Sequence, residues 1–206
     1  SARMEGEFGL DPVISPLLQS LIGHEDAGIA SGAMASLAAQ ARYAQTQRRM
    51  SLPLSELPGD LFHALLLAWR AYNGDDLSDA LVRAEGRLRA EYDEAAGRLS
   101  LLERVATLVG KDATNALIFD QAGIGLFLSA LALRTGQPRD IVAVSTHESQ
   151  VARLALGLRA AGLKPQDVEA QILRLHPDRD PPSDLADIGT REALNLLARS
   201  AGWPGN

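Results

Sequence analysis

Apolar residues recur at steps of three and four along residues 76–109, which is the spacing of one face of an α-helix. A seven-residue repeat begun at Leu77 would bring the charged residues Glu91 and Arg98 into this face, whereas an eleven-residue repeat keeps it apolar. The pattern therefore predicts one long, nearly straight helix over 76–109, about 50 Å in length. The residues of its apolar stripe are Leu77, Leu81, Ala84, Leu88, Tyr92, Ala95, Leu99, Leu102, Ala106 and Val109.

The other face of this predicted helix carries opposite charges four residues apart, as in Glu85 and the arginine four positions later. Such pairs contribute about 0.2–0.5 kcal/mol each and are typical of a face that is turned to solvent. We therefore expect Glu85 on the outside, and Leu88 and Leu99 in the core. Gly86 and Gly97 each cost about 1 kcal/mol relative to alanine in a helix, so they mark a bend or a close helix crossing.

Shorter helices are predicted on both sides of the long one. The first covers about 15–22, the second ends near residue 49, and the two prolines of the connector 52–58 exclude a continuous helix there. In the third helix, the apolar residues expected to share one side are Phe62, Leu65, Leu66, Trp69 and Tyr72.

Glycine and proline divide the second half of the chain. The stretch 140–145, which is the one candidate strand, follows a proline turn, and we interpret it as a short helix. Three later helices are each expected to stop at a glycine that a proline follows, namely Gly136, Gly162 and Gly202. The predicted fold class is all-α, an irregular stack of about nine or ten helices in hairpins around one long helix.

The same pattern predicts the domain organisation. Residues 1–11 contain glycine and little periodicity, so we expect a flexible lead-in. An N-terminal helical subdomain covers 12–109 and includes the long helix, and a C-terminal subdomain of helical hairpins covers 110–206.

Composition excludes several classes of protein. The 206 residues include no cysteine, so a disulfide framework and a thiolate metal site are both excluded. No apolar run approaches the roughly 20 residues of a membrane span, and no signal peptide opens the chain, which makes the cytoplasm the expected compartment. The net charge of −6 makes general binding to nucleic acid unfavourable.

No pattern of residues predicts catalysis, a cofactor or a metal ion. The four histidines lie in separate segments, and no two have the spacing of metal ligands on a helix. Gly123-Ile124-Gly125 lacks the third glycine and the preceding strand of a dinucleotide-binding loop, and no nucleophile motif is present. We therefore predict a protein without enzymatic activity, with an enzyme whose site is not visible in the sequence as one alternative.

The predicted partner-binding residues stand at the end of the second helix. They are Arg42, Tyr43, Arg48 and Arg49 in an otherwise acidic protein. Arginine beside tyrosine is a mixture that is enriched where proteins bind one another. The hypothesis is that this arginine patch binds an acidic segment of another protein or of a second copy, which makes the protein an interaction or scaffold module.

A helix-turn-helix regulator that binds DNA is the other alternative. Residues 138–161 have the helix, turn and helix spacing of such modules, and the second helix offers Gln150 and Arg153 to read bases. The net charge and the helix that follows, in place of a β-wing, weigh against this alternative.

Part of the first half resembles a known family. The residues that carry the resemblance are Met34-Ala35-Ser36-Leu37-Ala38-Ala39-Gln40-Ala41-Arg42, then Arg48-Arg49-Met50 and Leu54-Ser55-Glu56-Leu57-Pro58. They are similar to a bacterial family of unknown function with degenerate HEAT-like helical repeats. The resemblance implies a helical repeat fold and assigns no catalytic residue.

Overall fold

The computed structural model of the protein describes residues 9, 11, 13–74 and 78–200, apart from the side chains of 110–112. Within them the fold is all-helical, with 77% helix, ten α-helices and no strand, which confirms the predicted fold class. Most of the predicted lead-in, residues 1–8 and 10, lies outside the described residues, and so do residues 201–206 with the predicted helix stop at Gly202.

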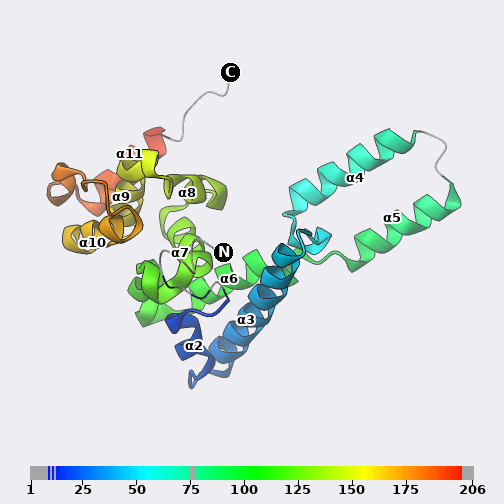
Figure 1. The fold of residues 1–206 in the computed structure, drawn as a ribbon, viewed down its shortest axis with the longest axis horizontal. Coiled ribbons are helices and arrows are strands. Elements are labelled where there is room, and N and C mark those ends of the chain that lie inside the picture. The colour runs from blue at the N-terminus through cyan, green and yellow to red at the C-terminus, as the bar shows by residue number, and fades with distance from the viewer. Residues whose placement is uncertain (1–8, 10, 12, 75–77, 201–206) are drawn as a thin grey trace.

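The described residues of the first half form five α-helices and two short 3₁₀ turns (Figure 1). Their bounds are α2 Pro16–Ile22, α3 Ala27–Arg48, η1 Leu54–Glu56, α4 Gly59–Asn73, α5 Asp79–Glu91, η2 Glu94–Ala96 and α6 Arg98–Leu108. Side chains next to the helix ends cap the first two of these helices. Ser15 caps α2 by accepting from the Leu18 N–H, and Asp26 caps α3 by accepting from two backbone N–H groups.

The second half, as far as residue 200, contains the other five described α-helices (Figure 1). The bounds here are η3 Gly110–Leu117, α7 Phe119–Thr135, α8 Arg139–Ser145, η4 Glu148–Gln150, α9 Val151–Ala160, α10 Pro165–Leu175, η5 Ser183–Ala186 and α11 Thr190–Ser200. As predicted, Gly136 ends α7 in the left-handed conformation, and the stretch 140–145 is helical.

The single helix predicted over 76–109 is wrong. The described part of this stretch forms two helices, α5 and α6, because the chain leaves the helical conformation at Tyr92 and Asp93, where ψ is 119° and 100°. The turn η2 follows, and Gly97 then caps α6 with an extended backbone. A Cβ on Gly97 would lie 2.9 Å from the Glu94 carbonyl oxygen, so the glycine marks the break between the two helices.

The main core lies where α2, α3, α6, α7, α9 and α10 meet. Phe119 and Phe127, both fully buried, pack edge to face at its centre, with ring centroids 5.7 Å apart. Leu102 of α6 is also fully buried, whereas Leu88 and Leu99 are only half-buried and lie outside this core, against expectation. The core joins residues from both predicted subdomains, whose boundary stays a prediction.

A kink in α7 lets α2 approach closely. Gly123 has φ 65° and ψ 164°, a conformation that only glycine adopts readily, inside the helix. A Cβ at this position would lie 3.1 Å from the Cβ of Ser15, the residue that caps α2. The glycine pair that fails as a dinucleotide loop therefore serves helix packing.

Candidate interaction surface

Helices α4 and α5 form an antiparallel hairpin that projects from the rest of the molecule (Figure 1). Among the described elements, neither helix makes extensive backbone contact with the core helices. The hairpin is attached at its base, where the connector before α4 meets the turn after α5 (Figure 1). Its outer surfaces are therefore open unless another molecule covers them.

The base of the hairpin is closed by an aromatic pair and two hydrogen bonds. The rings of Phe62 and Tyr92 stack with centroids 3.9 Å apart and planes 4° from parallel. The Tyr92 hydroxyl donates to the Leu57 carbonyl over 2.8 Å, and burial raises its pKa, which keeps the donor proton in place. The Gly59 N–H donates to Glu94 Oε1 over 3.0 Å. These contacts hold the two helices together where they join the body.

Replacing Tyr92 by phenylalanine tests this closure. The variant keeps the stacked ring but leaves the Leu57 carbonyl without its donor, so we expect the free energy of unfolding to fall by about 0.5–1.5 kcal/mol. Urea unfolding followed by circular dichroism measures the change. An unchanged midpoint would show that water replaces the hydroxyl at no cost.

Arg98 fixes the hairpin base to the end of α3. Its guanidinium lies 4.0 Å from the centroid of the Tyr43 ring, and its Nε donates to Glu56 over 3.2 Å. Both side chains of the ion pair are largely buried. Such cation–π contacts contribute about 0.5–2 kcal/mol. The hairpin therefore projects from a rigid joint among α3, η1 and α6.

A buried carboxylate bridges the two helices further along. Glu85 of α5 is 3% exposed and accepts from the Nε atoms of Arg70, over 2.6 Å, and Arg89, over 2.8 Å. The hydrogen bond from Arg70, followed by that from Arg89, lowers the pKa of Glu85, so the residue is ionised at neutral pH. The predicted pair with Arg89 is confirmed, but the predicted outward position of Glu85 is wrong, because Arg70 reaches across from α4 and covers it.

Helix α4 has two apolar faces, not the single one that was predicted. Phe62 and Leu66 are buried and Trp69 is half-buried, and the Phe62 ring stacks on Tyr92 at the end of α5. The expectation that Leu65 and Tyr72 share this side is wrong, since both are exposed. A helix in a two-helix hairpin has only one neighbour to bury one face, and the second face remains open.

The open face is a stripe of four residues: Leu61, Leu65, Ala68 and Tyr72, here called the outer stripe. Leu61 is 53% exposed, Leu65 42% and Tyr72 90%, so no described segment of the chain covers them. Steps of four, three and four residues place them on one side of α4. The sequence contains this spacing, but it does not stand out there, because the neighbouring positions are apolar as well and the whole run looks like one broad face.

Leu67 provides a natural comparison with the outer stripe. It is 52% exposed, much like Leu61, but lies about 200° around the helix axis from Leu65 at about 100° per residue. That opposite side also carries Arg70 and its bridge to Glu85. The hairpin thus has one uncharged apolar side on α4 and one side closed by ionic contacts.

The predicted arginine patch is only partly a surface feature. Arg42, Arg48 and Arg49 are exposed, and Arg49 caps the end of α3. Tyr43 is half-buried, and its ring lies beneath the guanidinium of Arg98, a residue that the hypothesis did not include. Whether the arginines bind an acidic partner stays a prediction.

The residues of the DNA-binding alternative lie in the helical body. Helix α9 packs against α7, α8, α10 and α11, and Gln150 is half-buried at its start. Arg153 donates to Gln137 over 3.0 Å and to Ser200 over 2.8 Å. The structure therefore does not bring these two side chains to an open helix face.

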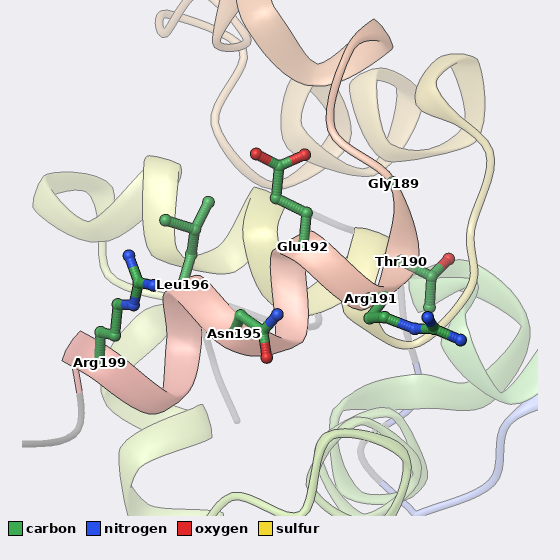
Figure 2. Close-up of a pocket in the computed structure, with 7 residues that line it drawn as sticks. All are labelled: Gly189, Thr190, Arg191, Glu192, Asn195, Leu196 and Arg199. Atoms are coloured by element: carbon green, nitrogen blue, oxygen red, sulfur yellow. The ribbon is translucent and has the colours of Figure 1, made fainter.

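A hollow with a volume of about 720 Å³ runs along α11 (Figure 2). Its described lining residues all come from 189–199, and Figure 2 shows Arg191 and Arg199 toward opposite ends with Asn195 between them. In an enclosed small-molecule site, polar groups from several segments point at the ligand. This hollow is lined by residues of one segment, so it lacks that arrangement.

Arg139 lines two smaller hollows, of about 310 and 190 Å³. Burial, and next the charge of Arg98, lowers the pKa of Arg139 to about 10, and its guanidinium donates to Ser129 and to the Gly125 carbonyl. Glu103 lines both hollows and offsets the positive charge. Arg139 therefore anchors α8 to α7 and does not define an anion site.

In the described residues no cluster of histidine and carboxylate side chains is arranged to hold a metal ion. None of the helices that the structure describes combines the length and the apolar composition of a membrane span. The outer stripe is the candidate interaction surface because it exposes Leu61, Leu65 and Tyr72 on one side of α4.

No family model, curated protein or solved structure was found that is similar to this chain. The resemblance of residues 34–58 to a bacterial family with HEAT-like repeats therefore stays a prediction.

Proposed function

We propose that the protein is an interaction or scaffold module of the bacterial cytoplasm that binds other protein surfaces through the α4–α5 hairpin. The observation that carries this proposal is the exposure of Leu61, Leu65 and Tyr72 on one side of a helix that already buries its other apolar face. Exposed apolar patches of this kind mark binding surfaces in soluble proteins. Anchors three and four residues apart are the form in which one helix binds a groove or another helix.

The rigid base of the hairpin supports the same proposal. The stacked Phe62 and Tyr92 rings and the Arg98 contacts hold α4 in place before any partner arrives. Binding then orders few additional groups, which lowers its entropic cost. Tyr72, at the far end of α4, offers the large amphipathic side chain that recurs in binding hot spots.

The DNA-binding alternative receives less support. Arg153 would have to give up its hydrogen bonds to Gln137 and Ser200, and α9 would have to leave four packed helices, before either could enter a major groove.

Site-specific photo-cross-linking in cells that express the protein natively tests the proposal. A cross-linking amino acid is placed at Leu65, and the matched control carries it at Leu67, which is similarly exposed on the opposite side of the same helix. We expect a discrete cross-linked protein from position 65 and none from position 67. Equal labelling from both positions, or none from either, would contradict the proposal.

A further inference from the structure

We infer that the outer stripe binds the outer stripe of a second copy of this chain, with the two α4 helices antiparallel about a two-fold axis. This inference rests on the proposed function and names its partner. The observation behind it is that the outer stripe is uncharged and has the same spacing of residues in both directions along α4.

The spacing makes the stripe self-complementary. Residues 61, 65, 68 and 72 are separated by four, three and four positions, so the series is the same read from either end. In an antiparallel pair, Leu61 then meets the partner's Tyr72, and Leu65 meets the partner's Ala68. Each contact occurs twice, as a two-fold interface requires.

The sizes of the side chains fit the same arrangement. The small Ala68 lies opposite a leucine at the centre, where large and small residues interdigitate. Ala64 and Ala71, both exposed, flank the stripe on the side away from α5. With alanines at these positions, two helices approach at the short end of the usual 8–10 Å separation.

The distribution of charge disfavours an acidic or a basic partner and is compatible with a second, equally uncharged stripe. Asp60 and Arg70 are the charged residues of α4 other than its histidine, and Arg70 is committed to Glu85 on the opposite side. The stripe itself therefore offers no counter-charge to an ionic partner. Antiparallel pairing also sets the helix dipoles in opposition, which is favourable.

The size of the hairpin limits the affinity. The facing side of α4, about 10 Å wide and about 20 Å long, has a flat footprint of about 200 Å². That is well below the roughly 800 Å² of accessible surface that each partner buries in an interface of standard size. We therefore expect a weak, reversible dimer with a dissociation constant toward the upper end of the micromolar range. Because each chain carries a net charge of −6, added salt should strengthen it.

Sedimentation velocity over about 1–500 μM protein tests the inference, with Leu65→Glu as the variant and Leu67→Glu as the control. We expect the wild type and the control to dimerise and the variant to remain monomeric, with dimerisation weakened by about 100-fold or more. Circular dichroism shows that both variants keep their helix content. A dimer that survives Leu65→Glu would overturn the inference, because the contact would then lie elsewhere.

Cross-linking determines the orientation, since the chain has no cysteine of its own. Leu65→Cys and Ala68→Cys are prepared as separate proteins with tags of different size and then oxidised alone or mixed. We expect the mixed disulfide to dominate, because the antiparallel pair sets these positions opposite each other. Predominant like-with-like disulfides would indicate a parallel pair and would contradict the arrangement.

The two experiments separate failure of this inference from failure of the proposed function. A protein that stays monomeric at all concentrations, but is cross-linked in cells through position 65 to a different protein, retains the function and loses the self-pairing. A monomer without cross-links at that position loses both.

Discussion

Replacing Phe127 by alanine should lower the free energy of unfolding by about 3–5 kcal/mol, which is the cost of emptying a large, fully buried aromatic site. Phe127 has no exposed surface, and its ring packs edge to face on that of Phe119. It lies in α7, which contacts α2, α6, α8 and α9, so these helices cannot close the cavity independently. The loss is a large share of the total free energy of unfolding of a domain, which is about 5–15 kcal/mol.

Urea unfolding followed at 222 nm measures this change, and Leu133→Ala is the control. Leu133 lies in the same helix but is exposed, so its truncation should cost well under 1 kcal/mol. If the two variants had equal midpoints, the core would not be centred on α7.

The order and ends of most helices can be predicted from the sequence because they depend on neighbouring residues. Ser15 caps α2, and Gly136 ends α7, through hydrogen bonds and backbone angles set within one helical turn. The fold class follows from the same spacing of apolar residues, which the structure confirms.

The break between α5 and α6 could not be predicted from periodicity alone. The apolar spacing continues through 92–98 even though the helix does not, because Tyr92 leaves the helix to stack on Phe62, thirty positions earlier. A contact across such a separation leaves no mark in the local pattern. Gly97 indicates the bend, but the apolar spacing around it favours a continuous helix.

The candidate site was missed for a related reason. The sequence shows that α4 is apolar at Leu61, Phe62, Leu65 and Leu66, but not which of two adjacent faces meets α5. The side chains that decide it are Arg70 and Glu85, fifteen positions apart in the chain, and their pairing requires the hairpin to have formed. The arginines near residue 48 are conspicuous in the sequence because they are charged, whereas the sequence does not distinguish an exposed leucine from a buried one.

The Arg70–Glu85–Arg89 bridge should make Glu85 the charged residue on which the hairpin most depends. Replacing Glu85 by glutamine removes the charge that both guanidinium groups face. We expect a clear fall in melting temperature and faster amide exchange in α4 and α5, while the core around α7 keeps its protection. Glu91→Gln, at an exposed site of the same helix, is the control and should leave both measurements nearly unchanged.

The same bridge predicts how the stability of the hairpin depends on pH. The two arginines hold the pKa of folded Glu85 below its ordinary value of 4.5, so the ionised side chain stabilises the folded hairpin. This contribution is fully present above the unfolded pKa and is lost as the pH falls through the folded one. The melting temperatures of the wild type and Glu85→Gln should therefore differ most above about pH 5 and converge in more acidic solution. A difference that stays constant down to pH 2–3 would mean that packing, and not charge, holds the two helices together.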